Sequence, residues 1–207
     1  MIFKKNILYR IHKKIKEAIS AKKKVLLWKL RGCPVPAPHA VKQMINKHYA
    51  AKFKPHIFIE TGTYMGEMID AVEGHFSKII SIEFDPKLAG RAQEKYSSAP
   101  HVTILQGDSG KLLPELLAKI NEPCLFWLDA HYSSGVTGHA DSETPIMKEI
   151  RAILDHSCPE HVILIDDARE FTGNKNYPTL AALRQLVQQK RKEWQMTVEA
   201  DIIRIHK

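Results

Sequence analysis

Short apolar runs alternate with amphipathic stretches along most of the chain, and this alternation predicts strands separated by helices. The apolar runs occupy residues 57–59, 79–82, 102–105, 124–128 and 161–165, and two strand-like pieces follow at 196–199 and 202–205. A short continuous apolar run is typical of a strand that is covered on both faces. The pattern therefore predicts an α/β fold with right-handed βαβ units and a doubly wound, mostly parallel sheet.

The stretches between these runs have helical spacing. Residues 39–53 place Val41, Met44, Ile45 and Tyr49 on one face, which predicts a helix leading into the first strand. Further helices are predicted at 67–72, 111–120, 146–154 and 177–192. With 207 residues, the chain is long enough for one such domain with a substantial core, and too short for two comfortable ones.

The first part of the chain has a different pattern. Apolar residues recur there every four positions, at Phe3, Ile7, Ile11, Ile15 and Ile19, with lysines between them. Residues 1–31 hold eleven Lys or Arg against one acidic residue, a local charge of +10, so that −2 of the total charge of +8 remains for residues 32–207. We therefore divide the chain into a basic amphipathic helical appendage at 1–33, a proline-rich linker and lead-in helix at 34–56, and the α/β domain at 57–207.

The basic appendage restricts the choice of partner. A basic amphipathic helix with large apolar residues is typical of peripheral contact with an anionic membrane surface. The alternative is a helix that packs on the domain or on a second subunit of a homo-oligomer. Nucleic acid is disfavoured, because no groove of interleaved aromatic residues is evident. No run approaches the length of a membrane span and no secretory signal is convincing, and three cysteines without metal-ligand spacing fit a reducing, cytoplasmic compartment.

The first strand leads into a turn that can bind a nucleotide-sized ligand. Glu60 ends the strand, Gly62 and Gly66 stand four residues apart, and a helical stretch follows. Glycine lets the backbone approach a ligand closely, and a carboxylate at the strand end attracts a cation such as a sulfonium. The spacing E-x-G-x-x-x-G resembles motif I of class I S-adenosylmethionine (SAM) dependent methyltransferases. The resemblance implies that Glu60, Gly62, Thr63, Tyr64 and Gly66 bind SAM.

Two later strand ends support the same resemblance. Glu83 ends the second strand, 21 residues after Gly62, where such folds hold a ribose diol. Asp108 and Ser109 follow the third strand in a loop that resembles the one that contacts adenine in methyltransferases. With Asp129 after the fourth strand, these residues complete the predicted cofactor site.

Asp129, Asp166 and Asp167 are acids beyond the needs of SAM. Three carboxylates from two successive strand ends could supply half of an octahedral Mg²⁺ shell, or bind another divalent cation. Asp166 and Asp167 can both bind one ion only if the chain leaves the strand at Asp166, because neighbouring strand residues point to opposite faces. Alternatively, the pair begins a turn or caps a helix. The trio resembles the metal-dependent O-methyltransferases of the catechol type and especially the macrocin-type sugar O-methyltransferases.

The resemblance covers residues 57–207 and predicts a SAM-dependent, metal-assisted enzyme that methylates a hydroxyl of a sugar, a glycan or another small polyol. Asp129 is a predicted catalytic residue as a ligand of the metal, which would fix and activate the hydroxyl, and His131 is the predicted catalytic base, with His139 as the second candidate. The chain departs from the sugar enzymes in having Ala130-His131 after the first acid, which leaves the acceptor open. An RNA or protein methyltransferase that uses the basic arm and a non-catalytic SAM-binding module are the alternatives.

Overall fold

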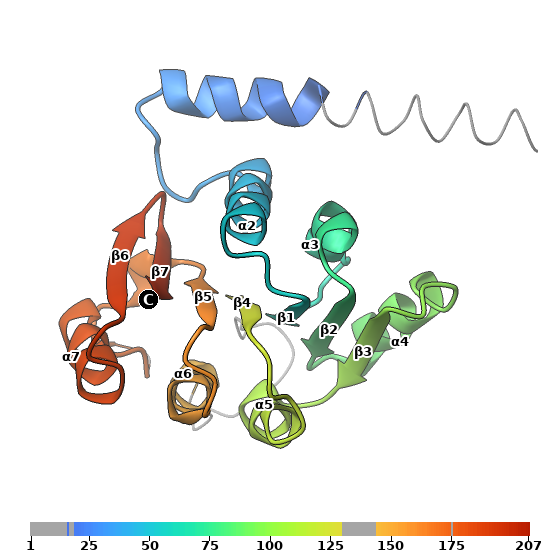
Figure 1. The fold of residues 1–207 in the computed structure, drawn as a ribbon. Helices are drawn as coiled ribbons and strands as arrows, with labels where there is room; N and C mark the ends of the chain where they lie inside the picture. Colours follow the sequence, from blue (N-terminus) through green and yellow to red (C-terminus); the bar gives the residue numbers. More distant parts are fainter. Residues whose placement is uncertain (1–15, 17–18, 130–143, 175) are drawn as a thin grey trace, which may run out of the picture.

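The described part of the computed structural model, residues 16, 19–129, 144–174 and 176–207, contains one sheet of seven strands in the order β3-β2-β1-β4-β5-β7-β6 (Figure 1). The first five strands are parallel, and β7 pairs antiparallel with both β5 and β6. The strands are β1 Ile57–Thr61, β2 Lys78–Glu83, β3 Val102–Gln106, β4 Cys124–Leu128, β5 Val162–Ile165, β6 Gln195–Glu199 and β7 Ile202–His206. The predicted α/β fold with a mostly parallel sheet is confirmed.

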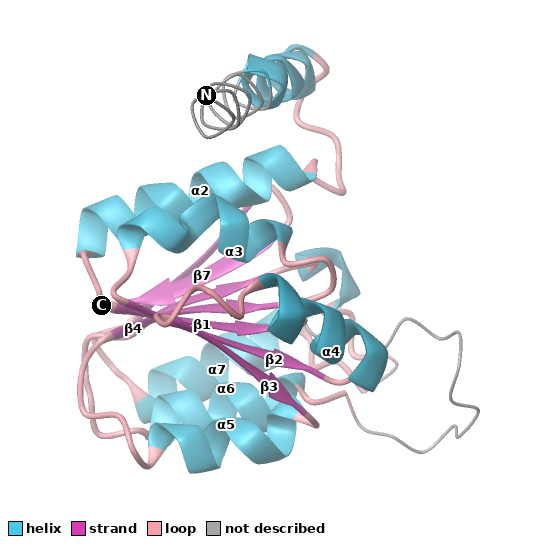
Figure 2. Ribbon diagram, turned by 90° about the vertical axis from the view of Figure 1, so that its right-hand side faces the viewer, coloured by secondary structure: helices cyan, strands magenta, loops and turns pink. Residues whose placement is uncertain are grey.

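Helices cover both faces of this sheet (Figure 2). One face carries α2 His39–Phe53, α3 Glu67–Val72 and α4 Pro86–Lys95, and the other carries α5 Ser109–Leu117, α6 Ile146–Asp155 and α7 Leu180–Lys190. Two short 3₁₀ helices, η1 Glu73–His75 and η2 Ala168–Glu170, follow α3 and β5. The bounds of α2 agree with the prediction, but Met44 was expected on its buried face and is 40% exposed.

Alternate residues of each central strand enter different halves of the core. Phe58, Trp127 and Leu164 belong to the cluster beneath α2 and α3, whereas Ile59 and Leu128 belong to the cluster above α5 and α6. Since side chains alternate along a strand, residues in step with Phe58, Trp127 and Leu164 face α2 and α3 as well. This alternation decides on which side of the sheet the polar residues at the strand ends lie.

The carboxyl ends of the parallel strands lie at one level. Thr61 of β1 pairs with Leu128 of β4, which in turn pairs with Ile165 of β5. The pairing continues one residue past the strands, because the backbone N–H of Asp129 donates to Thr61 O at 3.0 Å and that of Asp166 donates to Leu128 O at 3.0 Å. The acids that follow β4 and β5 are therefore neighbours at one edge of the sheet.

Residues 19–30 form a helix that lies over α2, outside the two layers of helices (Figure 1). Trp28 is 8% exposed and packs in the same cluster as Val41 and Ile45 of α2, and its indole N–H donates to Pro34 O at 2.8 Å. Of the predicted stripe, Ile19 is described, and Phe3, Ile7, Ile11 and Ile15 lie outside the described residues. Among the described helices, none combines the length and the apolar character that crossing a membrane requires.

Candidate functional site

The turn between β1 and α3 has the left-handed backbone conformation that its glycines permit. Gly62 has a φ of 90° and Gly66, which caps α3, has a φ of 72°. The hydroxyl oxygen of Tyr96 lies 2.7 Å from Gly66 O, directly where a side chain on Gly66 would be. Glycine is required at position 66 for both reasons, conformation and space. Tyr64, between the two glycines, also has a positive φ of 47°, and its side chain is 68% exposed.

Glu60 is a buried carboxyl group at the end of β1. Its side chain is 1% exposed, and Ser81 of β2 donates to its Oε2 at 2.6 Å. The hydroxyls of Thr63 and Ser81 are 2.6 Å apart, so a chain of three polar groups leads from the turn to Glu60. Burial raises the pKa of Glu60 to about 8, and the charges of Asp129 and Glu83 add to the rise. A buried acid with a raised pKa becomes ionised when a cation approaches it.

Glu83, at the end of β2, holds the turn from the neighbouring strand. Its Oε2 accepts the backbone N–H of Tyr64 at 2.8 Å and its Oε1 accepts that of Asp85 at 3.0 Å. The carboxylate is 7% exposed, and its hydrogen bond to Tyr64 fixes the path of the turn after β1. A carboxylate has about four acceptor positions, so these bonds leave capacity for the predicted ribose hydroxyls.

Asp108 and Ser109 lie at the next strand end. Asp108 is the N-cap of α5, and its Oδ1 accepts the backbone N–H of Gly110 at 2.9 Å. Ser109 is the first residue of α5 and is 6% exposed. The capping bond shows a structural role for Asp108. It engages one of the two oxygens, and the predicted adenine contact remains a prediction.

Asp166 and Asp167, after β5, meet a lysine from α2. The ammonium of Lys42 contacts Asp166 Oδ2 and lies 3.8 Å from Asp167 Oδ1. Asp167 has a φ of 54°, so the chain leaves the strand at this point and both carboxylates reach the same ammonium. This is the geometric condition that the sequence set for the pair. Asp166 and Asp167 thus converge on a lysine, whereas the sequence predicted that they converge on a metal ion.

The charge of Asp129 acts on the same group. Burial raises the pKa of Asp166, with Asp129 as the next cause, while Lys42 opposes the rise. Burial lowers the pKa of Lys42, but the charges of Asp166, Asp129 and Asp167 outweigh it and raise the pKa overall. Asp129 follows β4, which lies between β1 and β5 in the sheet, so it stands between Glu60 and the second acidic group, and its charge also raises the pKa of Glu60. The two groups of acids therefore share one edge of the sheet.

Asp167 also contacts a second cationic side chain, Arg169, which in turn contacts the buried Asp201. Arg169 of η2 donates to Asp167 Oδ1 at 2.7 Å, and the same nitrogen contacts Asp201 Oδ2. Asp201 lies in the turn between β6 and β7, is 7% exposed, and its Oδ1 accepts the backbone N–H of Arg169 at 2.9 Å. The β6–β7 turn thus fixes the segment that carries Asp167.

No protein-family model and no curated protein matches the sequence. Solved structures do resemble the chain. An O-methyltransferase from Bacillus cereus in complex with S-adenosylhomocysteine (SAH) is 13% identical with a TM-score of 0.57, and each chain is covered to 90%. The fold is that of class I SAM-dependent methyltransferases.

Other solved structures also resemble the chain, and one of them is an RNA methyltransferase. SAH-bound PaMTH1 from Podospora anserina is 17% identical, with a TM-score of 0.55 and coverage of 94% of this chain and 95% of that one. The 23S rRNA methyltransferase ErmE is 18% identical, with a TM-score of 0.51 and coverage of 79% of this chain and 67% of that one. Because one fold serves several acceptors, the acceptor has to be argued from the site.

The structure leaves part of the predicted site untested and adds one residue to it. His131 and His139, the candidate bases, lie outside the described residues. The sequence prediction missed Lys42. Its spacing of three and seven residues from Ile45 and Tyr49 places it on the apolar face of α2, and a lysine on such a face is a detectable signal.

The predicted metal site does not fit the arrangement of the described residues. The carboxylates of Asp129, Asp166 and Asp167 suit a hard divalent cation chemically. However, the ammonium of Lys42 contacts Asp166 Oδ2, and across the described ranges no group of three or more His, Cys, Asp or Glu is arranged to hold a metal. We therefore assign no catalytic step to Mg²⁺.

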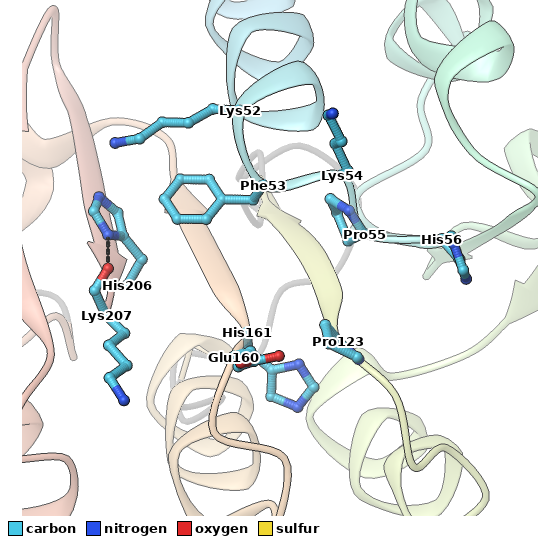
Figure 3. A pocket seen from close by; sticks show the side chains of 10 residues that line it. All are labelled: Lys52, Phe53, Lys54, Pro55, His56, Pro123, Glu160, His161, His206 and Lys207. Atoms are coloured by element: carbon cyan, nitrogen blue, oxygen red, sulfur yellow. Dashed lines mark hydrogen bonds between the residues drawn. The ribbon is translucent and has the colours of Figure 1, made fainter.

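A cavity of about 550 Å³ lies at the opposite end of the sheet (Figure 3). Residues 52–56 ahead of β1, Pro123 ahead of β4, and His206 and Lys207 after β7 contribute to its lining. His161, ahead of β5, also lines it, and there its Nδ1 accepts the backbone N–H of Cys124 at 3.1 Å. In class I methyltransferase folds and other doubly wound sheets, ligands bind at the carboxyl ends of the strands, so this cavity is not the candidate site.

Proposed function

We propose that this chain is a SAM-dependent O-methyltransferase that transfers a methyl group to a hydroxyl of a sugar, a glycan or another small polyol. One observation carries the proposal: the buried carboxyl groups of Glu60 and Glu83 flank the Gly62–Gly66 turn at the carboxyl edge of a class I methyltransferase fold. Buried acids around a glycine turn suit a cationic nucleoside better than a phosphate, which they would repel.

The chemistry of SAM sets what the site has to supply. In methyl transfer the acceptor oxygen forms a bond to the methyl carbon, the S–CH₃ bond breaks, and its electron pair stays on sulfur to give SAH. The hydroxyl proton passes to a base, for which His131 is the sequence candidate. Because the sulfonium is already activated, the protein's main task is to align the hydroxyl with the methyl group and to remove that proton.

The second acidic group supports a hydroxyl-rich acceptor. Asp166, Asp167 and Lys42 form a polar cluster next to Asp129, in which the carboxylates accept hydrogen bonds and the ammonium donates them. A sugar or polyol offers several hydroxyls at the spacing of such a cluster, and each satisfied hydroxyl contributes to orientation. An apolar acceptor would offer this cluster no hydrogen-bond partner.

Binding of the cofactor tests the proposal directly. Titration calorimetry on the purified chain is expected to show one site for SAM and one-to-one competition by SAH, with dissociation constants of about 1–100 µM. Transfer of labelled methyl groups to a panel of sugars and nucleotide-activated sugars then identifies the acceptor class. If neither SAM nor SAH binds, the proposed function is wrong.

Experiments on the same purified protein and its variants distinguish two other functions from the proposed one. An RNA methyltransferase is favoured by the basic arm and the similarity to ErmE, and it would bind RNA with an affinity that falls steeply with salt. A non-catalytic module would keep its cellular role in an Asp129→Ala/Asp167→Ala variant. The proposed enzyme would lose it.

For the basic helix we propose contact with an anionic membrane surface, at the cytoplasmic face. Its face opposite Trp28 is apolar and exposed: Ile19 is 63% exposed, Leu26 58% and Leu30 74%. Lysines flank this face at positions 22, 23 and 29. Packing of Trp28 on the domain leaves the opposite face available, and apolar residues bordered by lysines suit the boundary between lipid headgroups and acyl chains.

Vesicle binding checks this contact. Replacing Leu26 and Leu30 with serine is expected to weaken sedimentation with phosphatidylserine-containing vesicles at least about tenfold, since two leucines lose their burial in lipid. Val198→Ser, at an exposed valine on β6, is the matched control and should bind like the wild type. Equal binding of all three proteins would contradict the proposal, as would equal binding to neutral vesicles.

A further inference from the structure

Lys42 brings a fixed positive charge to the acids at the carboxyl edge of the sheet. Lys42 lies on α2, next to Val41, Ile45 and Tyr49, which are buried. Its side chain is 16% exposed, and its ammonium contacts a carboxylate that is 1% exposed. Burying an ionised carboxylate is costly unless a cation compensates it. Lys42 supplies that compensation from within the chain.

The oxygens that a metal would need are engaged by donors of the protein. Asp166 Oδ2 contacts Lys42, and Asp166 Oδ1 accepts the backbone N–H of Asp167 at 2.9 Å. Asp167 Oδ1 lies 3.8 Å from the same ammonium and accepts a hydrogen bond from Arg169 at 2.7 Å. Three of the four oxygens of this pair therefore face cations or N–H groups. A divalent cation could bind them only after Lys42 withdrew.

We infer that the ammonium of Lys42 takes the place of the divalent cation, so that this site works with a cation tethered to α2. The ammonium carries a single positive charge where the metal would carry two, but its position and the two carboxylates that it contacts are those expected of the metal. The chain differs from a metal site in that the cation cannot dissociate and can donate only along its N–H bonds.

The consequence for catalysis rests on the proposed function. An ammonium has three N–H donors; Asp166 takes one of them, and Asp167 Oδ1 at 3.8 Å is an ion-pair contact without a hydrogen bond, so a donor remains for the oxygen of the acceptor hydroxyl. Lys42 would then be a positioning residue that holds this oxygen and favours its negative charge as the proton leaves. Arginine at position 42 would keep the charge but not the compact geometry, so Lys42→Arg should not restore full activity.

Binding of Mn²⁺ tests the inference without knowledge of the acceptor. The free Mn²⁺ signal in electron paramagnetic resonance is measured on the full-length protein in five forms: wild type, Lys42→Ala, Asp166→Asn, Lys42→Ala/Asp166→Asn, and Lys47→Ala. Lys47 is an exposed lysine on the same helix and is the matched control. SAH binding is measured on the same samples, because it reports whether each variant is folded and whether the proposed function holds.

We expect wild type and Lys47→Ala to leave Mn²⁺ free up to about 1 mM, the weak end of oxygen-ligand sites. Removing the ammonium should make Lys42→Ala bind Mn²⁺ at least about tenfold more tightly, and the second substitution should abolish this gain. Wild-type protein that binds Mn²⁺ as tightly as Lys42→Ala would overturn the inference. So would wild-type binding that is lost in Asp166→Asn, a comparison that stands even if Lys42→Ala fails to fold. A wild-type protein that does not bind SAH would instead refute the proposed function and leave the inference about Lys42 standing.

Discussion

Replacing Glu60 with glutamine should raise the free energy of unfolding at pH 9 by about 3 to 5 kcal/mol, because each pKa unit corresponds to about 1.4 kcal/mol. The carboxyl group is buried, and burial with the nearby charges of Asp129 and Glu83 raises its pKa from 4.5 to about 8. Glutamine keeps an oxygen that can accept the hydrogen bond from Ser81 but carries no charge. Urea denaturation at several pH values measures the effect.

The sign follows from the two pKa values of Glu60. Below pH 4.5 the folded and unfolded chains both hold the proton, and the group costs nothing. As the pH rises from 4.5 to about 8, the unfolded chain loses its proton first, so stability is lost until the folded pKa is passed. Glu60→Gln should therefore match the wild type at pH 4 and exceed it at pH 9. An equal difference at both pH values would contradict the explanation.

The same substitution should weaken SAM binding at least about tenfold at pH 8.5, since a charge-assisted hydrogen bond to the cationic ligand is removed. Glu94→Gln, at an exposed glutamate on α4, is the matched control and should change neither stability nor binding. A more stable protein that binds its cofactor less well is the expected signature of a buried functional acid. Unchanged SAM affinity in Glu60→Gln would remove Glu60 from the cofactor site.

Replacing Gly66 with alanine should lower the free energy of unfolding by about 3 to 4 kcal/mol, of which about 1–2 come from the left-handed backbone and the rest from overpacking. Gly66 has a φ of 72°, and a Cβ there would lie 2.5 Å from the hydroxyl oxygen of Tyr96. That hydroxyl cannot simply move away, because it also lies 2.7 Å from Asp70 Oδ1. Thermal and urea denaturation measure the loss, and SAM calorimetry should show weaker binding.

Two variants separate the causes of this loss. Gly74→Ala should change stability by less than about 1 kcal/mol, since a Cβ at Gly74 would have no atom within 4 Å. Tyr96→Phe combined with Gly66→Ala removes the nearest atom and should recover part of the steric loss, since ring carbons at 3.0 and 3.2 Å remain, while the backbone part persists. If Gly66→Ala is as stable as the wild type, the turn is more adaptable than its contacts indicate.

Local pattern predicted the elements well because each central strand is covered on both faces. The uninterrupted run from Cys124 to Leu128 is buried throughout, and a run of that kind leaves few alternatives to a strand. The gathering of the acids could also be predicted, because each acid directly follows a predicted strand and parallel strands end at one edge of the sheet. What the sequence could not show is which helix crosses that edge. Lys42 reaches Asp166, which is 124 positions away in the sequence. Helix periodicity placed Met44, and not Lys42, on the buried face of α2.

The acidic cluster shows a second limit of sequence reasoning. Three acids clustered at two strand ends suggested an ion from solution, because like charges without a cation repel one another. The compensating charges are instead supplied by Lys42 and Arg169, from a helix before the sheet and a turn after β5. Asp201 was not a candidate at all, because a lone acid in a hairpin turn is typical of an ordinary turn.

The link from Arg169 to Asp201 sets when this protein can first bind a ligand during its synthesis. Every acid of the candidate site lies at or before residue 167, yet the bonds that hold the segment after Asp167 form only once Asp201 in the β6–β7 turn has emerged from the ribosome. Pairings between distant parts of a chain form late. Nascent chains that stop short of residue 201 should therefore be protease-sensitive around η2 and gain no protection from the cofactor.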